Sequence, residues 1–204
     1  MFKKIVLICI LGMMLINFSY SATKEVPITD LTKYTVQIFT VRPGITLCTG
    51  VIVHMDEKYS LVLTCKHCLS LNDEMYVEDL KVDFIISSST DDLALLVVKS
   101  KIPGKKAINK AAPIYNRLIN DEVILIGYSY LDRHCVYIAT GYISRYTDEW
   151  VFAELKIIPG CSGGPIFNKY GELVGIGWGG VGTQTIFEPI TDVIRFLKRF
   201  RIRL

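Results

Sequence analysis

What most limits the fold of this sequence is a long succession of short apolar runs, rich in β-branched and aromatic residues and separated by turn-forming residues. Such runs predict β-strands, and short strands with turns between them are typical of barrels or sandwiches. The sequence predicts strands over residues 34–41, 46–54, 60–64, 81–87, 93–98, 122–128, 135–145, 150–155, 164–168, 173–178 and 183–188. The polar, proline-containing stretch 99–113 separates the first five from the last six, so we expect two halves.

One loop between two of these strands, residues 159–165 with the sequence PGCSGGP, sets a serine among glycines. Glycine lets the backbone take positive φ and approach a ligand closely. In such a turn the amide N–H groups of Gly160 and Ser162 can converge on the point where a carbonyl oxygen becomes an oxyanion. We therefore expect Ser162 to be a nucleophile rather than part of a flexible connector.

A serine nucleophile needs a base and a carboxylate that orients the base. Of the three histidines, His67 follows an apolar strand, whereas His54 and His134 lie beside polar residues and are expected to be solvated. The expected carboxylate is Asp92, which begins the apolar run DLALLVV, because a charge at the end of a buried strand is costly without a partner. Its neighbour Asp91 is the alternative and is expected to be exposed.

Four motifs, in this order, resemble those of the trypsin-like (chymotrypsin-fold) serine peptidases. TCKHC at 64–68 is similar to the segment around the base, DLALL at 92–96 to that around the acid, and GCSGGP at 160–165 to that around the nucleophile. GIGWG at 175–179 resembles the strand that pairs with substrate backbone. The resemblance is closest to the small bacterial Deg or high-temperature-requirement type, without the PDZ domains of that group.

This resemblance implies an all-β fold of two packed antiparallel β-barrels with a C-terminal helix. Residues 22–112 would form the first barrel, with His67 and Asp92, and residues 113–204 the second, with Ser162 and the helix. The implied function is that of a secreted serine endopeptidase, which hydrolyses peptide bonds through a Ser-His-Asp triad and an acyl-enzyme without cofactor or metal. Two alternatives are a catalytically silent binding protein on the same fold and an esterase using the same triad.

The resemblance also implies how a polypeptide substrate would bind. The amides of Gly160 and Ser162 would form the oxyanion hole. The other substrate-binding residues would be Lys156, Ile157, Gly177, Trp178, Gly179 and Thr185. Since no aspartate stands at the position that selects Lys or Arg, we expect a small or medium apolar residue before the scissile bond, with an acidic residue as the second choice.

The five cysteines after residue 21 are an odd number. The resemblance implies a disulfide between Cys48 and Cys68, which would fix the loop of the base to the neighbouring strand. Partners of the others stay open, and one hypothesis pairs Cys135 with Cys161. We do not expect Cys161 to be the nucleophile, because it lies one residue out of register with the amides of the oxyanion hole.

The N-terminal segment has the pattern of a secretory signal: Lys3 and Lys4, an apolar run over 5–16, and small residues over 19–22. We expect removal of residues 1–21 and a secreted or periplasmic location. The apolar run is shorter than the ~20 residues of a bilayer-spanning helix, so no stable membrane insertion is expected after cleavage. Without the two lysines the formal net charge falls from +3 to +1, which gives no general attraction to nucleic acid.

At the C-terminus, Thr191 and Asp192 predict the start of a helix, with apolar residues at helical spacing from Val193 to Leu204. Basic residues occupy its other faces, namely Arg195, Lys198, Arg199 and Arg203. We expect them to form a solvated face of a helix packed on the second barrel, and docking to an anionic membrane surface is the alternative. The oligomeric state stays open.

Overall fold

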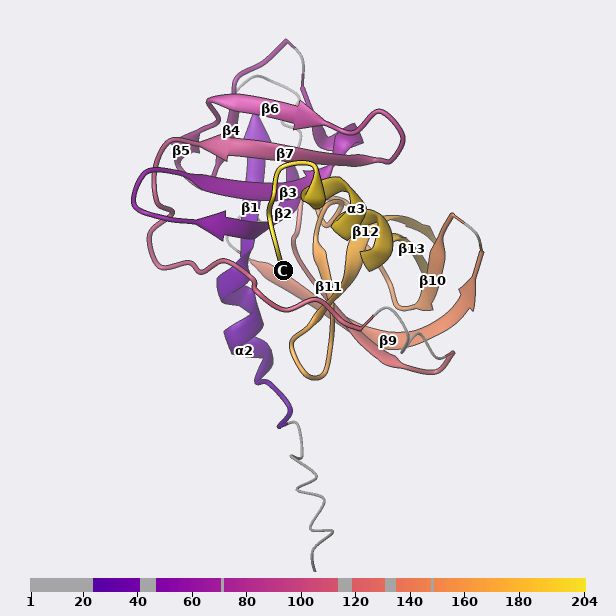
Figure 1. Ribbon diagram of the computed structural model, residues 1–204. Helices are drawn as coiled ribbons and strands as arrows, with labels where there is room; N and C mark the ends of the chain where they lie inside the picture. The colour runs from indigo at the N-terminus through magenta and orange to yellow at the C-terminus, as the bar shows by residue number, and fades with distance from the viewer. Residues whose placement is uncertain (1–23, 41–46, 71, 114–118, 131–134, 148) are drawn as a thin grey trace, which may run out of the picture.

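The computed structural model describes residues 24–40, 47–70, 72–113, 119–130, 135–147 and 149–204. The predicted signal segment and His134 lie outside these residues. Figure 1 shows two lobes built from β-strands, which lie side by side, with helix α3 against the second of them. Within the described residues no helix has the length and apolar character that crossing a bilayer requires.

The first lobe is a seven-stranded antiparallel sheet in the order β5-β4-β1-β2-β3-β7-β6. Its strands are β1 (Thr35–Thr40), β2 (Leu47–Met55), β3 (Ser60–Cys65), β4 (Met75–Val77), β5 (Leu80–Lys81), β6 (Phe84–Ser87) and β7 (Leu93–Val98). The short helices α2 (Ile28–Leu31) and η1 (Thr32–Tyr34) precede β1. The central strands are buried along most of their length, which is why they appear in the sequence as nearly continuous apolar runs.

The second lobe is a closed six-stranded barrel in the order β10-β13-β12-β11-β8-β9. Its strands are β8 (Glu122–Tyr128), β9 (Val136–Tyr146), β10 (Val151–Glu154), β11 (Pro165–Asn168), β12 (Leu173–Val181) and β13 (Gln184–Pro189). Strand β9 alternates exposed and less exposed residues, as expected where one face of a strand meets solvent and the other the barrel interior.

The all-β prediction is confirmed, and each predicted strand has a counterpart. The sequence did not reveal β4 and β5, because strands of three and two residues are too short to display an alternating pattern. The first lobe is a curled open sheet rather than a fully closed barrel.

Helix α3 (Ile190–Lys198) begins one residue before the predicted cap. Pro189 precedes it and no side chain caps it, so the predicted capping role of Thr191 is wrong. Asp192 lies in the first turn instead, where a carboxylate interacts favourably with the helix dipole. The helix packs against β12 and β13 of the second lobe. Its buried apolar residues join a core cluster that draws on both lobes.

The connection between the lobes is held by backbone hydrogen bonds to each of them. Ile108 donates its N–H to Ile52 O of β2 over 2.8 Å, and Ala112 donates to Leu173 O of β12 over 2.9 Å. Ile102 and Ile108 are buried. The stretch 99–113, which was predicted to separate the two halves, therefore packs against both lobes, although its composition is polar.

Candidate active site

Strand pairing in the first lobe brings His67 beside Asp92. Strands β3 and β7 are antiparallel and in register up to the pair Cys65 and Leu93. The residue before β7 therefore meets the short turn η2 (Lys66–Cys68) that follows β3. Residues 25 positions apart become neighbours because of this one pairing.

Both carboxylate oxygens of Asp92 accept hydrogen bonds from His67. The backbone N–H of His67 donates to Oδ1 over 2.9 Å, and the ring Nδ1 lies 2.5 Å from Oδ2. Because a carboxylate accepts, Nδ1 carries the proton and Nε2 is left with a lone pair. The arrangement fixes both the tautomer and the orientation of the imidazole, whose side chain is partly exposed.

The loop with Ser162 depends on two glycines in the left-handed region. Gly160 has φ +99°, and a Cβ on it would lie 2.4 Å from Tyr128 O. Gly163 has φ +81°, and a Cβ on it would lie 2.1 Å from Thr64 Oγ1. Any side chain at either position would force the loop to move. No described backbone carbonyl accepts a hydrogen bond from the N–H of Gly160 or Ser162.

Thr49 of β2 anchors this loop from the opposite lobe. Its N–H donates to Ser162 O over 2.8 Å, and its hydroxyl donates to Gly160 O over 2.8 Å. The same hydroxyl accepts the N–H of Tyr128 over 2.9 Å. Thr49 is fully buried. Sequence reasoning missed it, and the one available signal was a hydroxyl residue inside an apolar strand.

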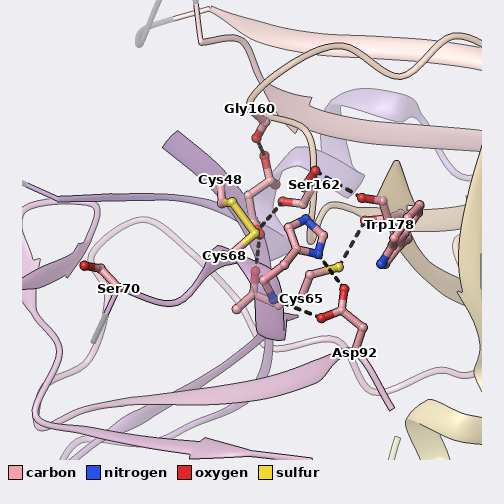
Figure 2. The surroundings of a disulfide bond; sticks show 12 residues. Cys48, Cys65, Cys68, Ser70, Asp92, Gly160, Ser162 and Trp178 are labelled. Atoms are coloured by element: carbon pink, nitrogen blue, oxygen red, sulfur yellow. Dashed lines mark hydrogen bonds and ion pairs between the residues drawn. A yellow bond between two sulfur atoms is a disulfide. The ribbon is translucent and has the colours of Figure 1, made fainter. Parts of the chain in front are cut away.

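The Ser162 hydroxyl donates to the carbonyl oxygen of Trp178 over 3.1 Å, as Figure 2 shows. The His67 ring meets the indole of Trp178 edge-on, with the ring centroids 6.0 Å apart. Ser162 and His67 therefore both lie against Trp178, one at its backbone and the other at its side chain. The structure thus brings Ser162 and His67, which is bound to Asp92, to one residue of β12.

A disulfide joins Cys48 of β2 to Cys68 of the η2 turn, the pairing that the family resemblance implied. It ties the strand that holds the Ser162 loop to the turn that holds His67 (Figure 2). The hypothesised bridge between Cys135 and Cys161 is wrong, because both thiols are free. Cys161 is buried against Gly127, where an added Cβ would lie 2.8 Å from its Sγ, whereas Cys135 is exposed.

Two buried thiols near the site are poor nucleophiles. Burial raises the pKa of the Cys161 thiol to about 12. Burial and then the charge of Asp92 raise the pKa of the Cys65 thiol well above its usual range. A thiol must lose its proton to attack or to bind a metal, so both cysteines are expected to stay protonated.

Cys65, His67 and Asp92 offer possible metal-ligating atoms that all lie within 4.8 Å of one another. Their chemistry fits hydrogen bonding better than metal binding. The Cys65 thiol donates to Gly177 O over 3.3 Å, and its raised pKa disfavours the thiolate. Nδ1 of His67 and Oδ2 of Asp92 already bind each other. We assign no metal site here.

The three residues of β12 that were predicted to bind substrate differ in whether their groups are free to do so. Gly177 is engaged within the protein, since its N–H donates to Gly164 O and its carbonyl accepts from Gly163 N–H, each over 2.8 Å. A substrate strand would therefore pair from Trp178 onward rather than from Gly177. Trp178 is 38% exposed and its ring lies 5.3 Å from that of Trp150. Beside Gly179 an added Cβ would meet no atom within 4 Å.

The predicted specificity residues differ in their surroundings. Ile157 packs against β12, where a Cβ on Gly180 would lie 2.6 Å from its Cγ2. Lys156 is exposed, and its carbonyl accepts the hydroxyl of Tyr137. Thr185 is fully buried and donates its hydroxyl to Leu155 O over 2.7 Å, so it holds the start of the segment that follows β10. Of these three, Ile157 is the side chain that contacts β12, the strand predicted to bind substrate.

Comparisons with known proteins identify the family and the fold. The family model described as the trypsin-like peptidase domain matches residues 48–176, which is more than half of the chain. The crystal structure of the active form of the Rv3671c protease from M. tuberculosis has a similar fold, with a TM-score of 0.70. That likeness covers 87% of this chain and 85% of that chain at 16% sequence identity, so it concerns the fold alone. No curated protein sequence matches this chain.

Proposed function

Since this chain belongs to the trypsin-like peptidase family, we propose that it is a serine endopeptidase with Ser162 as nucleophile, His67 as general base and Asp92 as the acid that orients the base. The observation that carries the proposal is the pair of hydrogen bonds from His67 to Asp92, next to a serine in a glycine loop. A histidine held in this way has one nitrogen left to take a proton.

Substrate binding itself would activate the serine. In the free protein the Ser162 hydroxyl donates to the Trp178 carbonyl. An extended substrate adding as a strand along β12 would present a backbone N–H to that same carbonyl. The serine hydroxyl would then lose its partner, and rotation about Cα–Cβ to another staggered position would turn it toward His67 Nε2.

The chemistry follows the serine-hydrolase scheme. Ser162 Oγ attacks the peptide carbonyl carbon while its proton passes to His67 Nε2. The negative charge on the carbonyl oxygen is stabilised by the N–H groups of Gly160 and Ser162, for which no described backbone carbonyl competes. The proton on His67 then moves to the leaving amine, and the C–N bond breaks to give the acyl-enzyme. Water, deprotonated by His67, releases the acid product.

The residue before the scissile bond is proposed to be apolar and of small or medium size. Ile157 lies against the glycines of β12, where it would limit the space for a long substrate side chain. An apolar wall offers no counter-charge to Lys or Arg. Lys156 is exposed, so an acidic preference remains the second option.

We also propose that the protein acts outside the cytoplasm, after removal of residues 1–21. The Cys48–Cys68 disulfide supports this, because such bonds persist in oxidising compartments.

A direct test is labelling with a fluorophosphonate followed by digestion of casein. We expect the probe on Ser162, and Ser162→Ala should lose labelling and about three or more powers of ten in turnover. Ser144→Ala on β9 is the matched control and should remain active. Casein cleavage that survives Ser162→Ala would contradict the nucleophile. Ester turnover without casein cleavage would favour the esterase, and an unlabelled, folded wild type would favour a binding protein.

A further inference from the structure

Glu188 is a buried carboxyl of the second lobe that contacts the proposed catalytic acid of the first. It lies near the end of β13, is 4% exposed, and accepts the backbone N–H of Asp92 at Oε1 over 3.1 Å. We propose that Glu188 is a positioning residue, which holds Asp92, and through it the His67 imidazole, in place relative to the lobe that carries Ser162. The inference rests on the proposed function, since it assigns a role around the proposed triad.

The bond matters because of where the other contacts of Asp92 originate. Its carbonyl accepts the N–H of Lys66 over 3.0 Å, and its two carboxylate oxygens bind His67. All of these partners belong to the η2 turn of the same lobe. Among the hydrogen bonds of the described residues, the one from the Asp92 N–H to Glu188 is its link to the second lobe.

Strand β12 fixes the position of Glu188. Glu188 is paired with Ile176, the residue directly before Gly177, whose carbonyl accepts the Cys65 thiol. Cys65 is the last residue of β3, at the entry to the η2 turn. Gly177 and Glu188 of the second lobe therefore bind the residue before η2 and the residue before β7, respectively. A shift of Glu188 would move Asp92 relative to the Ser162 loop.

The surroundings of Glu188 argue against a role as one half of an ion pair. It faces Asp91 and Asp92, Cys65 at the end of β3, and Asp192 of α3. Arg195 instead pairs with Asp192 over 2.8 Å and with Asp91 over 3.6 Å.

Burial, together with the charges of the neighbouring carboxylates, raises the pKa of Glu188 to about 7. A neutral carboxyl still has an oxygen that accepts an N–H. The contact with Asp92 therefore does not depend on charge, and the amide oxygen of a glutamine is expected to replace it.

Three variants of the full chain separate positioning from charge and from packing. Glu188→Gln keeps the acceptor, Glu188→Ala removes it, and Glu188→Asp keeps the carboxyl group but withdraws its oxygens by one carbon. Asp192→Asn is the matched control, because it removes a neighbouring carboxylate that does not bind Asp92. The readouts are kcat and KM on casein-derived peptides, and the NMR signal of the proton shared by His67 Nδ1 and Asp92.

We expect Glu188→Ala and Glu188→Asp to lower kcat by about tenfold to a hundredfold, with KM nearly unchanged, because a small misplacement of catalytic groups acts on the chemical step. Glu188→Gln and Asp192→Asn should stay close to wild type. The Nδ1 proton signal should broaden or shift in the first two variants and persist in the others. If Glu188→Ala does not fold, Glu188→Asp decides.

Wild-type kinetics in folded Glu188→Asp, or a loss in Glu188→Gln as large as in Glu188→Asp, would overturn the proposal. The NMR readout needs no turnover. Suppose that wild type and all variants are inactive, but that only Glu188→Ala and Glu188→Asp lose the proton signal. This result would contradict the proposed function and still support the positioning role.

Discussion

The hydroxyl of Thr49 donates a hydrogen bond to the carbonyl of Gly160 over 2.8 Å, so a strand of one lobe holds the nucleophile loop of the other. The same oxygen accepts the N–H of Tyr128. Thr49→Val keeps the shape and removes both bonds. We expect it to lower the free energy of unfolding by on the order of 2 kcal/mol, because two buried polar groups lose their partner.

Thr49→Val should also lower kcat by about tenfold or more, because the Gly160 carbonyl is no longer held and the neighbouring amides shift. Thr49→Ser is the matched control, since it keeps the hydroxyl, and it should retain most of the activity. Urea unfolding and peptide kinetics on the three proteins check this. Equal loss in both variants would show that the methyl group matters rather than the hydrogen bond.

The Cys48–Cys68 disulfide closes a loop of 20 residues, which contains β3 and ends just after His67. By restricting the unfolded chain, such a bond contributes about 3 kcal/mol. The double variant Cys48→Ser with Cys68→Ser is expected to lose this amount in denaturant unfolding under oxidising conditions. Under reducing conditions the wild type should lose a similar amount. A double variant as stable as the oxidised wild type would contradict the expectation.

The fold was predictable because its strands are apolar runs separated by clear turns, and His67, Asp92 and Ser162 each lie next to such a run. Thr49 and Glu188 escaped prediction for a physical reason. Their partners are backbone groups 111 and 96 positions away in the sequence, and a hydrogen bond to backbone leaves no trace in the partner's residue type. The packing between the lobes, which the sequence pattern does not encode locally, makes both contacts.

The same reason explains what the sequence could not show about Gly177. Its motif predicted a strand open to substrate, but Gly163 and Gly164, just before β11, bind both of its backbone groups within the protein. Thr185 likewise stands in a segment predicted to line the pocket, yet its hydroxyl is taken by Leu155 O. The way in which the segments pair decides the contacts of both residues, and the amino-acid sequence alone does not show this pairing.

The three free cysteines among the described residues should differ in reactivity. Cys135 is exposed, whereas Cys65 and Cys161 are buried with raised pKa values. Iodoacetamide is therefore expected to modify Cys135 within minutes and to leave the other two intact in the folded protein. Peptidase activity should survive the treatment. Mass spectrometry of the alkylated protein checks this, and inactivation coupled to modification of Cys161 would revive the cysteine as a nucleophile.

The buried Glu188 should make stability depend on pH. Its pKa is about 7 in the folded protein against an ordinary value of 4.5. Between these two values the folded state keeps a proton that the unfolded state has released, so this group lowers the stability as the pH rises. Above pH 7 the loss is complete. Glu188→Gln does not titrate and should be more stable than wild type above pH 7, by on the order of 2 kcal/mol after allowance for solvent screening.

Below pH 4.5 the two proteins should have nearly the same stability, because the carboxyl is neutral in both states of the wild type. Denaturant unfolding at intervals between pH 4 and pH 8 measures the difference directly. A difference that stays constant over this range would mean that Glu188 does not titrate there, and a difference that shrinks as the pH rises would reverse the sign. Glu188→Gln is expected to keep full kcat. If it is both more stable than wild type and active, the loss of stability from burying this acid is separate from the role of residue 188 in holding Asp92.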